Sequence, residues 1–305
     1  MEWLSKIFVE PFADMIAAPD FLMQVIWEGL VSGVLYALIA LGFVLIFRSS
    51  RIFNFAQGVM ALFAAMTLYG IMNGLVPFAH LINAVFGTDI HTFGWNVPAL
   101  AAILLTIGVM IGFSWLVQRF IFRHLVGQEP IILFMATIGL AYFLEGVGDL
   151  MWGSDIKTLE VGLPQGINET IDRVTFEAFG YGFFIDNLDI VASCVAAVLV
   201  MALVVFAQYT KQGRAMRAVA DDHQAALSVG VSLNFIWILV WSLAGFVALV
   251  AGIMWGAKSG VQFSLSLIAL KALPVLMLGG FTSIPGAIVG GLIIGVGEKL
   301  FEFWI

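Results

Sequence analysis

Long uninterrupted runs of apolar residues constrain this chain more than any other feature. Six runs of 21 to 26 residues cover 22–47, 53–75, 97–117, 131–152, 189–209 and 235–256, and a broken pair follows at 267–281 and 286–304. A hydrocarbon core of roughly 30 Å takes about 20 apolar residues in a helix, and only helices and closed barrels satisfy their backbone hydrogen bonds there. The sequence therefore predicts an all-α polytopic membrane protein with about eight apolar spans, including discontinuous helices around 279–286.

Composition excludes several classes of protein. The chain is 62% hydrophobic and 11% charged, whereas soluble domains are about 45–50% apolar and about 25% charged. A net charge of -7 leaves no basic patch for nucleic acid, and the single cysteine can form neither an internal disulfide nor a thiolate metal site. The sequence contains no phosphate-binding loop, metalloprotease motif or nucleophile elbow. We expect no catalytic residues, no metal, no cofactor and no nucleic-acid partner.

Charged residues predict the domain organisation and the orientation. Residues 1–20 have the pattern of an interfacial segment, and 21–305 form a single transmembrane domain. The connection 153–188 carries six acids, is expected outside the cell, and is long enough for a small hairpin. Three alternating connections hold most of the basic residues and are expected in the cytoplasm; they contain Arg48, Arg51, Arg119, Arg123, Lys211, Arg214 and Arg217.

Small residues predict where helices pack closely. Glycines recur four residues apart at Gly29 and Gly33, at Gly286 and Gly290, and at Gly291 and Gly295. In lipid, burial of apolar surface brings no gain, so helices associate where small residues let their backbones approach. We expect most of these glycines to serve packing.

Ionisable groups at membrane depth are costly and suggest function. Glu28, Asp149 and Lys271 lie where their side chains can reach an interface, and Lys271 marks the start of the broken segment. Glu145 lies deeper than Asp149 by one helical turn. It either packs against a polar group of a neighbouring helix or lines a route.

An amide pair stands at the start of the second apolar run. Arg48 and Arg51 place this segment at the cytoplasmic interface, and Asn54 and Gln57 follow three residues apart on one helix face. Such a pair needs polar partners within the membrane, which are either neighbouring groups of the protein or a permeating solute.

Segment 213–230 predicts a short cytoplasmic helix. Asp221 or Asp222 can cap its start, and Gly230 suits the left-handed residue that ends a helix. The expected helix of about two turns carries a small apolar surface, which either docks on a soluble partner or packs on its own protein. That surface is formed by Ala225, Ala226, Leu227 and Val229.

Four segments together resemble the membrane permease subunits of branched-chain amino-acid (LIV-type) ABC importers. They are 48–58 with its N-F-A-Q-G motif, 136–140 (A-T-I-G-L), the 213–230 loop, and 278–287 with the L-G-G-F-T-S-I-P-G-A break. The similarity runs over roughly 21–300, and the motifs are specific in combination rather than singly.

The resemblance implies a non-catalytic pore subunit of the bacterial inner membrane. It implies a second related permease, giving a heterodimer, two cytoplasmic subunits that bind and hydrolyse ATP, and an extracytoplasmic solute-binding protein. The expected substrate-pathway residues are Asn54, Gln57, Glu145, Gly279, Gly280, Ser283 and Pro285. The residues expected to couple to the ATPases are Arg214, Arg217, Asp221, Asp222, Ala225, Ala226, Leu227 and Gly230.

Two departures from the family pattern leave alternatives open. Val59 stands where many relatives carry glutamate, and the chain stops soon after a G-E-x-L match at 297–300, where relatives usually continue. A permease of the same architecture for urea, short amides or small carboxylates is therefore an alternative to branched-chain amino acids. A different class of protein, a gated channel or an ion-coupled carrier, is a further alternative, and the carrier would need Glu145 as its coupling acid.

Overall fold

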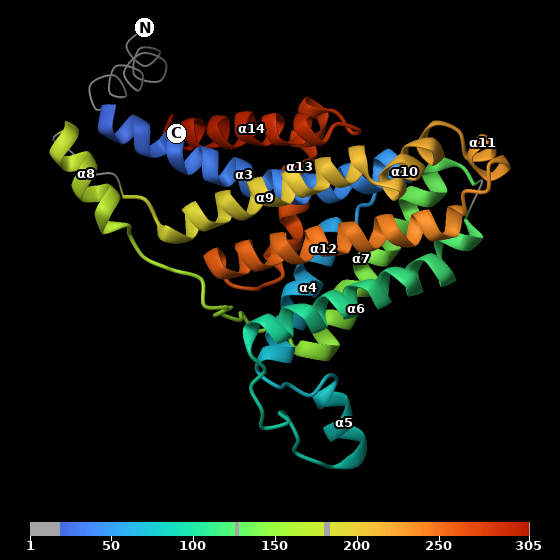
Figure 1. Ribbon diagram of the computed structural model, residues 1–305. Helices are drawn as coiled ribbons and strands as arrows, with labels where there is room; N and C mark the ends of the chain where they lie inside the picture. The colour runs from blue at the N-terminus through green and yellow to red at the C-terminus, as the bar shows by residue number, and fades with distance from the viewer. Residues whose placement is uncertain (1–18, 126–127, 180–183, 305) are drawn as a thin grey trace, which may run out of the picture.

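The computed structural model describes residues 19–125, 128–179 and 184–304 (Figure 1). Every named element in these ranges is a helix, and the three β-bridges found there are isolated residue pairs. The interfacial segment predicted over 1–20 lies outside the described residues except for Pro19 and Asp20, which begin the first long helix. The prediction of an all-α membrane protein is confirmed.

Six helices are long and apolar enough to cross a membrane, rather than the eight spans predicted. They are α3 (Pro19–Ser50), α6 (Ala99–Phe120), α7 (Pro130–Trp152), α9 (Asn187–Tyr209), α12 (Leu233–Ser259) and α14 (Ile284–Trp304). The other two apolar runs form α4 (Gln57–Met72) and α13 (Ser264–Gly279), of 16 residues each. At 1.5 Å per residue they are about 24 Å long, which is less than the hydrocarbon core. The apolar run predicted from residue 53 is shortened because residues 53–56 belong to no helix.

Short helices gather at one end of the bundle, which we call the basic end. In Figure 1, α10 (Lys211–Asp221) and α11 (His223–Ser228) lie there, opposite the start of α3 and the end of α14. Arg48 of α3 and Arg217 of α10 line one cavity at the basic end. The structure thus brings together two of the connections that the charge pattern predicted to share a side.

The acidic connection lies at the opposite end of the bundle. It is long enough for a small hairpin, and the part that the structure describes contains the amphipathic helix α8 (Glu169–Phe179) and one bridge between Ile167 and Asp186. Polar residues every few positions let this stretch form a surface helix. Its first part is fastened to the turn after α12, because the backbone N–H groups of Lys157 and Val261 each donate to the other residue's carbonyl, at 3.0 and 2.8 Å. The connection before α6 carries α5 (Ala79–Phe86).

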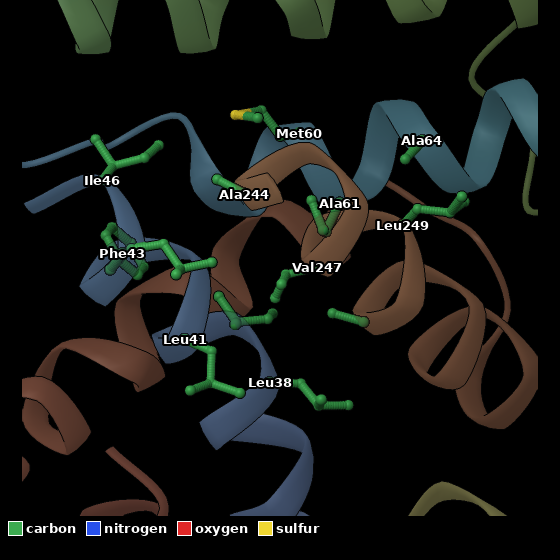
Figure 2. Close-up of a cluster of buried hydrophobic side chains, with 14 of the residues drawn as sticks. Leu38, Leu41, Phe43, Ile46, Met60, Ala61, Ala64, Ala244, Val247 and Leu249 are labelled. Carbon is green, nitrogen blue, oxygen red and sulfur yellow. The ribbon is translucent and has the colours of Figure 1, made fainter. Parts of the chain in front are cut away.

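Helix α4 is the centre of the core. Thirteen of its residues are buried, and a helix that is apolar all round is one that other helices surround. Figure 2 shows Leu41 and Phe43 of α3, Ala61 of α4, and Val247 and Leu249 of α12 gathered in one cluster. The short helix is thus held between two of the longest ones.

Glycines bring α3 and α14 into backbone contact, as predicted. A Cβ atom placed on Gly29 would lie 2.6 Å from Cα of Val296 and 3.0 Å from the carbonyl oxygen of Gly295. A Cβ atom on Gly33 would overlap the carbonyl of Gly291. The two glycine pairs therefore face each other across one interface. In lipid, burial of apolar surface does not drive helices together, and van der Waals contact between the closely spaced backbones stabilises the interface instead.

Candidate translocation and coupling sites

The predicted amide pair lies in the non-helical stretch before α4 and at its first residue. The backbone N–H of Ala56 donates to Oδ1 of Asn54 at 3.1 Å, and Nδ2 of Asn54 donates to Oε1 of Gln57 at 3.2 Å. Nε2 of Gln57 donates to the carbonyl of Ala244 in α12 at 3.2 Å. Both side chains are fully buried. In this conformation neighbouring groups of the protein therefore satisfy the pair.

Thr137 of α7 holds the same stretch from the other side, and sequence reasoning did not select it. Its hydroxyl accepts from the backbone N–H of Phe55 at 3.1 Å and reaches the carbonyl of Phe53 at 3.1 Å. The side chain is fully buried. Its place in the A-T-I-G-L motif could have identified Thr137, because it is the one hydrogen-bonding side chain of that motif.

Aromatic rings connect this stretch to the broken segment. The ring of Phe281, between α13 and α14, lies 6.1 Å from Phe53 and 5.2 Å from Phe47 of α3. Phe53 also contacts Phe134 of α7 at 5.9 Å. The two segments predicted to line a pathway are thus neighbours, although more than 200 residues separate them in the sequence.

The break around 279–286 is confirmed. Helix α13 ends at Gly279 and α14 begins at Ile284. Gly280 has a φ of +86°, which favours glycine, and its N–H donates to the carbonyl of Leu276 at 2.8 Å. Ser283 caps α14, because its hydroxyl accepts from the N–H of Gly286 at 3.0 Å. Pro285 is exposed at the start of the helix. Irregular backbone of this kind lies in protein or beside a watery cavity, not against lipid.

The short helix predicted in 213–230 is α11. Oδ1 of Asp222 accepts from the N–H groups of Gln224 at 2.8 Å and Ala225 at 3.0 Å, so Asp222 rather than Asp221 is the cap. Gly230 has the predicted left-handed conformation, with a φ of +85°. The preceding helix α10, capped by the hydroxyl of Thr210, was not predicted.

One residue predicted on the apolar surface of α11 faces inward instead. Ala226 is buried, whereas Leu227 is 52% exposed and Val229 is 77% exposed. A helix turns about 100° per residue, so neighbours in sequence point in different directions and one face must rest on the protein. The surface open to a partner, which we call the apolar tip, consists of Ala225, Leu227 and Val229.

Helix α10 lies next to the broken segment. Met216 and Val219 of α10 are buried, and Nη2 of Arg217 donates to the carbonyl of Gln208 in α9 at 3.4 Å. A cavity of about 320 Å³ is lined by Arg217, Arg48, and Pro285 at the start of α14, among others. Helix α10 therefore packs against α3 and α9 and shares a cavity with the start of α14. Arg214 and Asp221 point toward the exposed side.

Glu145, the remaining predicted pathway residue, lies apart from the break. It is partly buried on α7, eight residues or about two turns after Thr137.

A charged cluster that the sequence did not reveal lies between α3, α12, α13 and α14. Nζ of Lys271 is 2.6 Å from Oε1 of Glu298 and donates to the hydroxyl of Tyr36 at 3.3 Å. The Tyr36 ring stacks on Trp255 at 5.8 Å. Lys271 was expected to extend toward an interface, but it forms an ion pair instead. Glu298 was noticed only as part of the G-E-x-L match.

These elements define the class of protein. The described residues include six long apolar helices and a short buried one, a discontinuous helix pair carries irregular backbone, and a short helix with an apolar tip is exposed at the basic end. Discontinuous helices beside polar groups at membrane depth are typical of transporters. The fold and sites are those of a multi-pass helical transport protein.

Comparison with known proteins identifies the family. The chain matches the family model described as branched-chain amino acid transport system / permease component over residues 25–305. It belongs to that family of permease components. It is 30% identical over 280 residues to the high-affinity branched-chain amino acid transport system permease protein BraD of Pseudomonas aeruginosa, covering 90% of this chain and 85% of the relative.

Two further relatives extend over similar lengths. The permease protein LivH of Escherichia coli K12 is 28% identical over 287 residues, covering 93% of this chain and 87% of LivH. A probable LivH of Methanocaldococcus jannaschii is 26% identical over 288 residues, covering 92% of this chain and 82% of the relative. No solved structure gives a significant match.

Proposed function

We propose that this chain is the pore-forming subunit of an ATP-driven importer that moves branched-chain and similar hydrophobic amino acids across a bacterial inner membrane. The named relatives, LivH and BraD, are permeases of high-affinity branched-chain amino acid transport systems. The observation that carries the proposal is the arrangement at the basic end. There a capped helix exposes an apolar tip, and the preceding helix α10 shares a cavity with the start of α14 at the break.

Energy for transport then comes from partners. Of the two cytoplasmic ATP-binding subunits, one docks on the apolar tip of α11, with Arg214, Arg217 and Asp221 of α10 and the capping Asp222 around it, and the other docks on the second permease. Gly230 ends α11 and lets the chain turn into α12, and the buried Ala226 anchors the helix to the bundle. ATP-driven movement of the docked subunits pushes α10 against α3 and α9, which line a cavity together with the start of α14. A second, related permease completes the pore.

The solute enters from the opposite end, where an extracytoplasmic binding protein docks near 153–188. Its pathway follows the broken pair past Gly279, Gly280, Ser283 and Pro285. Asn54 and Gln57 hold the non-helical stretch beside the break, and Glu145 contributes a polar wall on α7. The supporting contact is that between Phe53 and Phe281, which joins these two irregular segments.

The decisive experiment places a charge on the apolar tip. In proteoliposomes that contain the whole importer, Leu227→Asp is expected to lower binding-protein-stimulated ATP hydrolysis and leucine uptake at least tenfold, because a carboxylate is costly in an apolar interface. Gln128→Asp changes an exposed residue in the connection between α6 and α7 and is expected to behave as the wild type. Unchanged hydrolysis in Leu227→Asp would refute the docking role, and uptake without the ATP-binding subunits would favour an ion-coupled carrier.

A further inference from the structure

We propose that Lys271, Glu298 and Tyr36 form the site that holds the charged backbone of an α-amino acid in transit. This inference rests on the proposed function and specifies its substrate site. Lys271 receives the carboxylate of the solute, Glu298 receives its ammonium group, and the stacked rings of Tyr36 and Trp255 flank the aliphatic side chain.

The first argument is the depth of the charges. Tyr36 lies 17 residues after the start of α3 and 14 before its end, so it is about 21 Å from the basic end of that helix at 1.5 Å per residue. The Lys271 ammonium and the Glu298 carboxylate meet beside it. Ionised side chains at such depth are rare, and face a water-filled cavity or another protein rather than lipid.

The second argument is that the pair is open. The Lys271 side chain is 54% exposed and that of Glu298 is 35% exposed, although they are only 2.6 Å apart. An ion pair enclosed by apolar side chains would be closed to a solute. This one instead faces a cavity of about 490 Å³, whose lining includes Tyr36, Trp255 and both charged residues. That volume is in the range of about 300–1,000 Å³ found for small-molecule sites.

The third argument is chemical complementarity. In the empty site the two charges neutralise each other. A zwitterion replaces one ion pair with two, and the net charge of the site stays unchanged. The hydroxyl of Tyr36 lies 3.3 Å from Nζ of Lys271. This hydroxyl can also donate a hydrogen bond to a bound carboxylate. A solute with only a carboxylate or only an ammonium group leaves one site charge without its partner at membrane depth, which is costly. The site is therefore selective for the zwitterion.

Apolar walls complete the site. Leu35 of α3 lines the same cavity. A second cavity of about 250 Å³ shares Trp255 and Lys271 and adds Leu265 and Ile268 of α13. Sites for small solutes usually combine such walls with a few convergent polar groups. The walls suit an aliphatic side chain, and the charges suit its backbone.

Further charged residues that line the cavity lie near the ends of α12 and α14, and they indicate access from the end opposite the basic end. Lys258, in the last turn of α12, lines the cavity and is paired with Asp189 of α9 at 2.6 Å. Lys299 and Glu302 of α14 also line it and pair at 2.7 Å. This is the end of the bundle that carries the acidic connection.

A binding measurement without any substitution tests the selectivity. The probe is tritiated L-leucine, bound to the whole membrane complex in nanodiscs in the absence of the solute-binding protein. We expect 4-methylpentanoate, which lacks the ammonium group, and 3-methylbutylamine, which lacks the carboxylate, to compete at least tenfold more weakly than unlabelled leucine. Equal competition by either compound would overturn the zwitterion site.

Variants then assign each charge. Glu298→Gln is expected to weaken leucine binding at least tenfold and to abolish its advantage over 4-methylpentanoate. Lys271→Met is expected to abolish the advantage over 3-methylbutylamine. A purely structural ion pair would weaken binding of all three compounds alike, and that result would overturn the assignment. Asp149→Asn removes an exposed acid of α7 near its end and serves as the matched control, with unchanged binding expected.

Uptake separates this inference from the proposed function. If wild-type proteoliposomes supplied with ATP and the binding protein fail to accumulate leucine, the proposed function is refuted and the amino-acid site with it. If they accumulate leucine, and the two variants bind and transport it like the wild type, only this inference is refuted.

Discussion

Gly33→Ala tests the backbone contact on which the α3–α14 interface depends. The added methyl group would overlap the carbonyl of Gly291. The obstacle is backbone of the facing helix, so the helices must separate rather than a side chain turn aside. Overpacking costs about 1–3 kcal/mol, with rigid neighbours at the upper end, and alanine returns about 1 kcal/mol of helix propensity. We expect a net loss of about 1–2 kcal/mol in the free energy of unfolding.

The assay is reversible unfolding in mixed detergent micelles, with Gly108→Ala as the matched control. Gly108 lies in α6, and a methyl group added there would meet no atom of a neighbouring helix within 4 Å, so its substitution is expected to be neutral or slightly stabilising. Gly33→Ala combined with Gly291→Ala should cost less than the sum of the single changes, because both act on one contact. If Gly33→Ala proves as harmless as Gly108→Ala, the inferred close approach of α3 and α14 is wrong.

Two further predictions concern the ends of the bundle. Asp222→Ala removes the two hydrogen bonds that start α11 and is expected to destabilise that helix by about 1 kcal/mol. Amide hydrogen exchange in α11 should be faster in this variant, whereas Asp222→Asn should retain most of the protection. Equal exchange in the wild type and both variants would contradict the capping role. Burial lowers the pKa of Lys157 from its usual 10.5, although Asp155 opposes the shift. Between that lowered pKa and 10.5 the unfolded state binds more protons, so stability should rise with pH. Lys157→Met should flatten this rise in unfolding measurements; an unchanged slope would rule out Lys157 as its source.

Local chemistry made several elements readable from the sequence. The cap and the end of α11 follow from Asp222 and Gly230, because a carboxylate beside free N–H groups and a glycine with positive φ act within one helical turn. The break between α13 and α14 follows from its glycines and Pro285 in the same way. Such features depend on residues that are close in the sequence, so the sequence is sufficient to predict them.

Which face of each helix is buried could not be predicted as well from the sequence. Ala226 and Leu227 are adjacent in sequence, yet one is buried and the other is half exposed. Segments 53–75 and 267–281 are as apolar as true spans, but each forms a short helix of 16 residues, and the first of these, α4, is enclosed by other helices. Hydropathy records how apolar a residue is and not whether lipid or protein surrounds it, so a buried helix and a spanning helix have the same pattern.

The number of long helices did not follow from the sequence, which predicted about eight spans where the described residues contain six. The helical membrane class of this protein, the break before α14 and the capped helix at the basic end did follow from it. Those properties arise from side chains and backbone within a few residues of each other. Only the tertiary structure decided which polar groups meet. Lys271 pairs with Glu298, 27 positions away, and with Tyr36, 235 positions away. The packing of α3, α13 and α14 against one another brings these groups together, and no local pattern specifies that approach.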